Sequence, residues 1–217
     1  VASLDQSLQR MGLDYVDIFY HHRPDPKTPI EETMGALDLI VKQGKAIYAG
    51  VSNYGGDRFC EAVETVRLHD WSPLVIHQQH YNMLARGPEQ WLYPHTRRAG
   101  TGVIAFCPLS QGRLTDRYLK GLPADSRQGR SESGKAWYEQ QKAEGVWAKV
   151  AKLNEVALRR GQSLAQMALT WILRDPHIAS VLIGVSKLEQ LKDNIGAARA
   201  PLLSEEELKQ IDAILSE

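Results

Sequence analysis

Short apolar runs alternate with amphipathic segments along most of the chain. The runs near residues 15–20, 46–51, 74–79, 102–107 and 179–184 are rich in Val, Ile, Phe, Tyr and Ala, which favours β-strands. Between them, apolar residues recur at helical spacing, and the first four runs return about every 30 residues. Strands that alternate with helices and are apolar on both faces predict a parallel sheet with right-handed crossovers.

Local signals at the helix ends refine this pattern. A first helix is predicted to end at Gly12, where a left-handed C-cap is expected. The next helix is predicted to open with Thr28 as N-cap, Pro29 as its first helical residue and Glu31 closing a capping box. A capping box over Ser204–Glu207 opens the last helix. Further single helices are expected over residues 55–70, 87–100, 146–161, 163–176 and 187–200.

A parallel sheet of this kind belongs to a doubly wound fold or to a (β/α)₈ barrel. No Gly-x-Gly-x-x-Gly turn follows the first strand, which disfavours the doubly wound alternative. A barrel needs eight units and ~250 residues, whereas five units are visible here. We therefore expect one α/β domain over residues 1–217 that carries the last five βα units of a TIM-type barrel plus a C-terminal helix. About three N-terminal units would be absent.

Composition excludes several other classes of protein. Lys+Arg and Asp+Glu both total 26, so the formal charge is zero and nothing favours nucleic acid as a partner. The 2 cysteines are too few for a disulfide scaffold and fit a reducing, cytoplasmic setting. No apolar run approaches the ~20 residues that cross a bilayer, so no membrane insertion is expected.

Functional groups of a (β/α) barrel lie at the carboxyl ends of its strands, where the loops converge. In this chain those ends are His21-His22, Ser52-Asn53 and the segments 78–82, 106–110 and 184–186. Four of them supply polar groups and one supplies an aromatic ring. The set indicates a shared site, although loops are polar in any protein and chance clustering is the alternative.

Five motifs in this order and spacing resemble the aldo-keto reductases. They are "DYVDIFYHHRPD", "GKAIYAGVSNY", "PLVIHQQHYNML", "IAFCPLSQGRLTDRY" and "SVLIGVSKLEQLKDNI", and together they extend over essentially the whole chain. The resemblance is to the branch of the potassium-channel β-subunits and the L-glyceraldehyde 3-phosphate reductases. It implies a (β/α)₈ barrel that binds NADP(H) and transfers hydride to or from the carbonyl of a small-molecule substrate.

The same resemblance assigns a catalytic role to His22. In family members the matching His lies beside the substrate carbonyl, and a neutral imidazole N–H can orient and polarise a carbonyl oxygen. The ordinary alternative is that His22 only hydrogen-bonds loop backbone. His21 points to the opposite side of the strand by alternation, so a structural role is expected for it.

The nicotinamide end of the cofactor is assigned to three strand ends. Ser52, Asn53 and Gln78 match the family residues that hydrogen-bond the carboxamide. Phe106 matches the aromatic residue on which the nicotinamide ring stacks. The alternatives are ordinary turn and strand-end roles for Asn53 and Gln78, and a plain core position for Phe106.

The phosphate end is assigned to two later segments. The loop that begins at Cys107 matches the one that wraps the pyrophosphate, and Arg127 resembles a further phosphate contact or is a solvated arginine. The last motif would bind the adenosine 2′-phosphate and adenine at a helix N-terminus, where Lys187 favours NADP over NAD. Its Asp193 stands where the family commonly has the longer Glu. The residues are Cys107, Pro108, Leu109, Ser110, Gly112, Arg127, Gly184, Ser186, Lys187, Gln190, Asp193 and Asn194.

The family's proton donor, a Tyr assisted by a Lys and an Asp, is carried on its first three strands, and no matching segment occurs here. We therefore expect the chain alone to be inactive as a reductase. Three functions stay open: the larger part of an NADPH-dependent reductase of aldehydes or ketones, a nucleotide-binding regulatory or scaffold subunit, and an inactive truncated product. The substrate is not readable from the sequence, and neither is the oligomeric state, so a homo-oligomer stays open.

Overall fold

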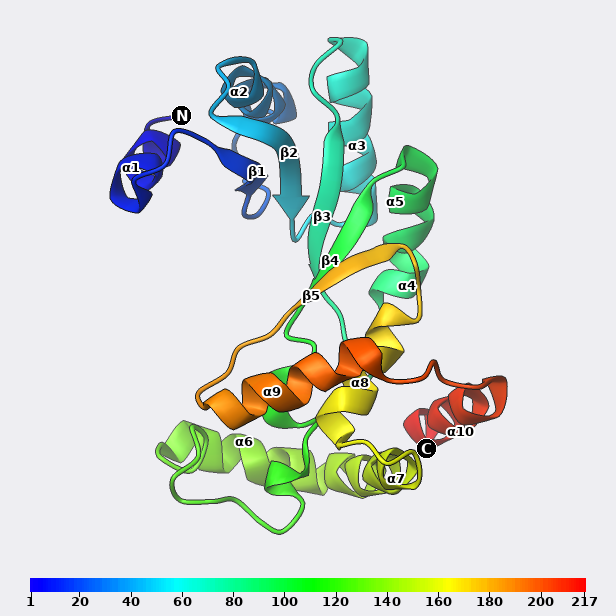
Figure 1. Cartoon of the computed structure of the whole chain (residues 1–217). Coiled ribbons are helices and arrows are strands. Elements are labelled where there is room, and N and C mark those ends of the chain that lie inside the picture. Colours follow the sequence, from blue (N-terminus) through cyan, green and yellow to red (C-terminus); the bar gives the residue numbers. More distant parts are fainter. The chain divides into compact units, whose positions relative to one another are not determined.

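The computed structural model describes all 217 residues, which form two compact units. Unit 1 comprises Val1–His80, Arg86–Phe106 and His177–Ser180. Unit 2 comprises Tyr81–Ala85, Cys107–Pro176 and Val181–Glu217. Figure 1 shows the elements of both units along the chain. Each unit is described by itself below.

Unit 1 is built around a sheet whose strands follow one another in chain order, β1-β2-β3-β4-β5. The pairs β1–β2, β2–β3 and β3–β4 are parallel. The five predicted strands are all present, and their ends lie within two residues of the predicted ones. The elements are α1 (Ala2–Met11), β1 (Val16–His21), α2 (Ile30–Lys42), β2 (Ala46–Ser52), α3 (Gly56–Leu68), β3 (Leu74–His80), α4 (Pro88–Trp91), α5 (Tyr93–Ala99), β4 (Gly102–Phe106) and the first residues, to Ser180, of β5 (Ile178–Leu182).

Helices cover the strands of unit 1 because each presents an apolar stripe to them. Helix α2 contacts β1 and β2, α5 contacts β4, and α3 lies between these two helices, a row that Figure 1 shows beside the strands. Helix α1 buries Leu4 and Leu8 against Ile40 and Ala46. This packing fixes where β1 begins and hence where its carboxyl end lies.

Two of the predicted helix ends were wrong. Thr28 does not cap α2: Pro29 is the N-cap, Ile30 is the first helical residue, and the predicted capping box with Glu31 is absent because no side chain caps this end. The Thr28 hydroxyl instead donates to Asp25 Oδ2 at 2.8 Å, since the Asp25 carboxylate already organises the turn by accepting from Lys27 N at 3.0 Å. The single helix expected over residues 87–100 is divided at Leu92, because Pro94 has no N–H to donate to the preceding turn.

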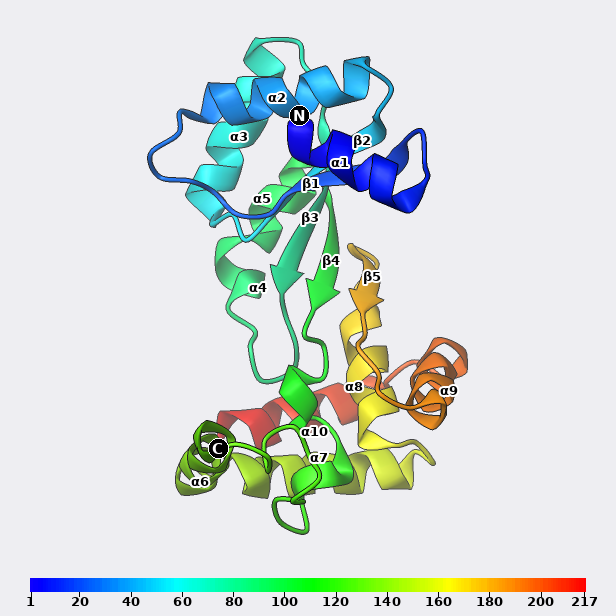
Figure 2. The ribbon, with the colours of Figure 1, turned by 90° about the vertical axis from the view of Figure 1, so that its left-hand side faces the viewer.

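Unit 2 is mainly helical. Helix α7 contacts α6, α8 and α10, and Figure 2 shows α6, α7 and α10 together in this unit. Helix α8 supplies more buried apolar residues than any other helix of this unit, among them Met167, Trp171 and Ile172. None of the helices in either unit is long and apolar enough to cross a membrane. The elements are η1 (Ser110–Gly112), η2 (Asp116–Tyr118), α6 (Glu132–Ala143), α7 (Val146–Arg159), α8 (Leu164–Leu173), α9 (Leu188–Gly196), η3 (Ala197–Arg199) and α10 (Glu205–Ser216).

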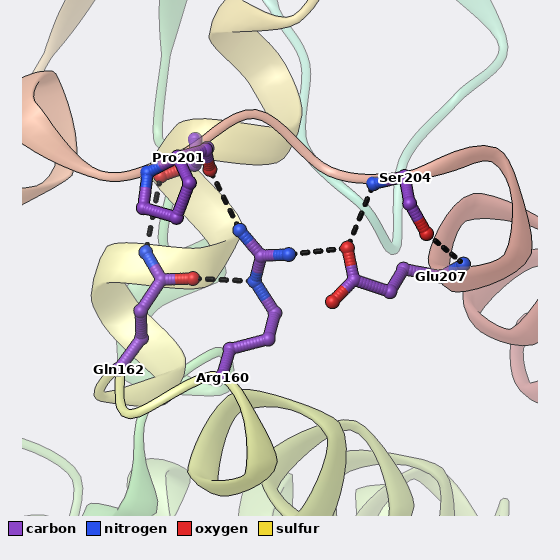
Figure 3. A network of polar contacts seen from close by, with 6 residues as sticks. Arg160, Gln162, Pro201, Ser204 and Glu207 are labelled. Carbon is purple, nitrogen blue, oxygen red and sulfur yellow. Dashed lines mark hydrogen bonds and ion pairs between the residues drawn. The ribbon is translucent and has the colours of Figure 1, made fainter.

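A buried arginine ties the end of α7 to the start of α10 (Figure 3). Arg160 donates to Gln162 Oε1 at 2.6 Å, to the carbonyl of Pro201 at 2.7 Å and to the carboxylate of Glu207. Glu207 also completes the predicted capping box with Ser204, which is confirmed. Burial opposes ionisation of Glu207, but the bonds from Ser204 and Arg160 outweigh it and lower the pKa of this carboxyl group.

Candidate functional site

The carboxyl ends of β1, β2 and β3 bring four of the predicted site residues together in unit 1. Asn53 is the centre of this group: its Nδ2 donates to the carbonyl of His22 at 3.1 Å and to Ser52 Oγ at 3.0 Å. Its backbone N–H donates to the carbonyl of Gln78 at 3.2 Å. Ser52 and Gln78 are also register partners in the β2–β3 pair. Residues far apart in the sequence thus share one edge of the sheet.

The turn after β2 has a backbone that asparagine is suited to adopt. Asn53 has φ 59°, a left-handed conformation that asparagine tolerates better than most residues with a Cβ. The following residue, Tyr54, is buried and accepts at its carbonyl from His77 Nε2 at 3.1 Å. Its hydroxyl lies 2.7 Å from His21 Nδ1. Bonds from β1 and β3 therefore hold this turn from both sides.

Burial sets the protonation of the groups around this turn. It raises the pKa of Tyr54 to about 12 and lowers that of His77 to about 4, so both are neutral near pH 7. Burial also lowers the pKa of His21, partly offset by the nearby Asp25 carboxylate. The side chain of His21 is engaged with Tyr54, in line with the structural role predicted for it.

His22 differs from its neighbour in its exposure. It follows the last residue of β1 and its side chain is exposed, while its backbone carbonyl is held by Asn53. An exposed imidazole on a fixed backbone can approach a ligand without first leaving a protein partner. The catalytic role of His22 stays a prediction.

Phe106 ends β4 at the same edge of the sheet. It is half-buried and is the register partner of His80. The two rings lie with their centroids 5.4 Å apart and their planes tilted by 32°. Phe106 is thus neither fully buried nor exposed, and its contact with the nicotinamide ring stays a prediction.

In unit 2, the predicted pyrophosphate loop forms a tight turn with unusual backbone angles. Cys107, Ser110 and Gln111 have φ of 53°, 50° and 58°, and Gly112 has φ 91°. The N–H groups of Ser110 and Gly112 donate within the turn, to the carbonyls of Cys107 and Leu109, both at 2.9 Å. These two amides are engaged inside the turn in the structure, and the contact of this loop with a pyrophosphate, which the family resemblance implies, stays a prediction.

Sequence reasoning missed Arg113, which follows this turn. Its Nε donates to Ser110 Oγ at 3.1 Å and to the Ser110 carbonyl at 3.3 Å, and its Nη1 donates to Gln141 Oε1. No local pattern signals this role, because Gln141 lies 28 residues further along the chain.

The predicted 2′-phosphate segment leads into the N-terminus of α9. Gly184, Ser186 and Lys187 are exposed, and Lys187 is the N-cap residue of this helix. Gln190 Oε1 accepts from the Ser186 N–H at 2.9 Å and from its hydroxyl at 3.2 Å. The structure therefore brings Ser186 and Gln190 together at the start of α9, where the exposed Lys187 is the N-cap residue.

Two residues of α9 face the interior of unit 2. Asp193 Oδ2 accepts from Ser163 Oγ at 2.6 Å, and Asp193 Oδ1 accepts from Gln166 Nε2 at 3.0 Å. Asn194 is buried. The carboxylate of Asp193 thus anchors the N-terminus of α8. Arg127, by contrast, is exposed, and neither alternative for it is decided by its surroundings.

Comparisons with known proteins identify the family of this chain. The protein-family model described as "Aldo/keto reductase family" matches residues 1–216. An L-glyceraldehyde 3-phosphate reductase of Escherichia coli (strain K12) is 48% identical over 223 residues, which cover 98% of this chain and 62% of the relative. A probable voltage-gated potassium channel subunit beta of Oryza sativa subsp. japonica is 35% identical over 218 residues, or 99% of this chain and 66% of the relative.

Among solved structures, a thermostable aldo-keto reductase crystallised with the inhibitor epalrestat is similar to this chain, with a TM-score of 0.75 and 29% identity. The match covers 98% of this chain and 65% of that one. The chain therefore spans less than two thirds of the length of these relatives. The matches do not confirm that it is the C-terminal portion of a barrel, and that interpretation stays a prediction.

Proposed function

Because the chain belongs to the aldo/keto reductase family, we propose that it binds NADP(H) and serves hydride transfer between this cofactor and the carbonyl group of a small aldehyde or ketone. The bound cofactor would supply or accept the hydride. The observation that carries this proposal is the joining of His22, Asn53 and Gln78 at one edge of the parallel sheet.

The donors and acceptors at this edge fit a carboxamide. Both Nδ2 hydrogens of Asn53 are used by His22 and Ser52, which leaves its Oδ1 as an acceptor. Gln78 adds a second side-chain amide on the neighbouring strand, and an amide group offers both donors and an acceptor. A nicotinamide carboxamide, itself one donor group and one acceptor, is matched by this pair. Phe106 would contact the ring.

The phosphates are assigned to unit 2. The Ser186–Gln190 segment lies at the start of α9, where the helix dipole favours an anion, and Lys187 adds a positive charge there. This combination favours a 2′-phosphorylated nucleotide over NAD. The turn of residues 107–112, which comes after β4, would contact the pyrophosphate.

His22 is proposed to orient the substrate carbonyl. An imidazole N–H that donates to the carbonyl oxygen polarises the bond and stabilises the negative charge that develops on oxygen. The alkoxide also needs a proton, and loss of a general acid typically lowers the rate by ~10²–10⁴-fold. That the chain alone is inactive is therefore a prediction that the same assay tests.

We propose a phosphorylated short-chain aldehyde as the first substrate to test. The supporting observation is that the relative named L-glyceraldehyde 3-phosphate reductase shares 48% of its aligned residues with this chain. We also propose that the parallel sheet belongs to a TIM-type barrel, of which this chain supplies five βα units. The similarity to a solved aldo-keto reductase supports this architecture.

The experiment is a pair of measurements on the purified protein, NADPH binding and aldehyde-dependent loss of NADPH absorbance. His22→Gln replaces the imidazole N–H with an amide N–H donor, and His22→Ala leaves no donor. We expect both variants to bind NADPH as the wild type does. Absence of turnover in the wild type would confirm the predicted inactivity of the chain alone. In a longer protein that contains this chain and reduces aldehydes, His22→Ala should lose more turnover than His22→Gln. A folded wild-type protein without affinity for NADPH would refute the proposal.

A second candidate is a nucleotide-binding regulatory or scaffold subunit. It is favoured by relatives named as potassium channel β-subunits in Oryza sativa, Arabidopsis thaliana and Schizosaccharomyces pombe, at 34–35% identity. NADPH binding without turnover, together with a co-purifying partner protein, would support it. The higher identity to the reductases places the enzyme first.

A further inference from the structure

The turn of residues 107–112 in unit 2 holds an unfavourable backbone. Its left-handed residues include three that carry a Cβ, namely Cys107, Ser110 and Gln111. Such a conformation costs about 1–2 kcal/mol per residue for ordinary L-residues. A backbone of this kind persists only where the surrounding structure determines it. The contacts around the turn therefore decide whether it keeps this shape when no ligand is bound.

Arg113 provides the contacts that link this turn to helix α6. Through Nε it holds both the hydroxyl and the carbonyl of Ser110, the residue at the centre of the strained run. Through Nη1 it donates to Gln141 Oε1 on α6. Its guanidinium carbon also lies 5.9 Å from the ring centroid of Trp137, on the same helix. One side chain thus joins the turn to two residues of α6.

The charge of Arg113 is balanced only at a distance. Burial lowers its pKa, an effect that Glu144 opposes, but a guanidinium group stays protonated at neutral pH. Glu144 is not bonded to it directly: Gln141 stands between them, accepting from Arg113 and donating through Nε2 to Glu144 Oε2 at 3.2 Å. Since Nε and Nη1 of Arg113 are already bonded to protein groups, we expect Arg113 to act by holding the turn and not by contacting the anion directly.

We propose that Arg113 is a positioning residue that presets the 107–112 turn for an anionic ligand and couples its occupancy to α6. This inference rests on the proposed function, which assigns the cofactor pyrophosphate to this turn. Without the guanidinium, the Ser110 hydroxyl loses its donor and the strained run can relax. The ligand would then have to reorder the turn on binding, and its affinity would fall.

The test uses Arg113→Met, Arg113→Lys and Gln141→Leu in the purified protein. Arg130→Met is the matched control, because Arg130 lies in the same stretch of unit 2 with an exposed side chain. For Arg113→Met we expect NADPH affinity to fall about ten- to a hundredfold, the scale of losing charge-assisted hydrogen bonds. Arg113→Lys cannot bond Ser110 and Gln141 in the same way and should lose nearly as much. Gln141→Leu should lose less.

Three further readouts separate positioning from a loss of folding. The far-ultraviolet circular dichroism and the cooperative thermal unfolding of the wild type should be retained in the variants, so that the defect appears in NADPH affinity and not in folding. Hydrogen exchange of the peptide covering residues 107–114, measured without ligand, should be faster in Arg113→Met than in Arg130→Met. In the wild type, NADPH should change the tryptophan fluorescence, and Arg113→Met should weaken that change.

Unchanged NADPH affinity together with unchanged exchange in Arg113→Met would overturn the inference. If Arg113→Met does not fold, Arg113→Lys and Gln141→Leu decide between the same outcomes. If the wild type binds no NADPH, the proposed function fails, while the exchange of the unliganded turn still shows whether Arg113 presets it.

Discussion

His77 should make the stability of the protein depend on pH between its unfolded and folded pKa values. Its side chain is fully buried in β3, where Nε2 donates to the carbonyl of Tyr54 and the ring packs edge-on against Phe59. Burial lowers its pKa from 6.5 to about 4. The folded state therefore resists protonation over a range in which the unfolded chain accepts a proton.

The sign and size of the effect follow from proton linkage. Between pH 6.5 and about 4 the unfolded state binds more protons than the folded state, so stability falls as the pH falls. The contribution is fully present above pH 6.5 and lost by about pH 4. One pKa unit corresponds to about 1.4 kcal/mol, so a shift from 6.5 to about 4 changes the free energy of unfolding by about 3 kcal/mol in total.

Urea denaturation followed by circular dichroism, at steps from pH 7.5 to 4, would measure it. The matched control is His77→Gln, because a Gln side chain can place an amide donor near the position of Nε2 without titrating. The variant should lose stability more slowly than the wild type as the pH falls. Equal pH dependence of the two proteins across this range would refute the assignment of a buried, neutral His77.

Two further substitutions test contacts outside the sheet edge. Arg160→Met should lower the free energy of unfolding by about 2–4 kcal/mol, because it leaves the partly buried Glu207 carboxylate without its cation. The control Lys152→Met removes a more exposed ion pair, with Glu217, and should lower it by less than about 1 kcal/mol. Equal losses in the two variants would contradict this prediction. Asp193→Ala should lower stability by about 1–2 kcal/mol through the loss of its bonds to α8 but leave most of the NADPH affinity, as measured by titration; a large loss of affinity at unchanged stability would instead support an adenine contact.

The strands and their order could be predicted from the sequence because their signals are local. An apolar run with β-branched residues that ends in polar residues marks both a strand and its carboxyl end, as in residues 46–53. The helix ends were less predictable. The Thr28 hydroxyl donates to the Asp25 carboxylate instead of capping α2, and a capping pattern takes no account of such an alternative partner. Pro94 was visible in the sequence, but its effect on a continuous helix was underestimated.

The candidate site was predictable only as far as its residues carry motifs. His22, Asn53 and Gln78 were named in advance, and the structure joins them. The hydrogen bonds between them were not predictable, because they depend on strand register. Arg113 lies inside the motif "IAFCPLSQGRLTDRY", but its role was not predictable from that motif. The role depends on a bond to Gln141 on α6, a helix formed from a polar stretch.

The turn after β2 shows how narrow the choice of residue can become at one position. Glycine at position 53 would relieve the backbone but supply no amide. Aspartate would keep an oxygen for a ligand, but it would place a carboxylate oxygen, which only accepts hydrogen bonds, against the carbonyl oxygen of His22 to which Asn53 donates. Glutamine has the right group on a longer arm and a poorer fit to the left-handed backbone. Only asparagine meets all of these demands, so libraries of variants should tolerate almost nothing else here.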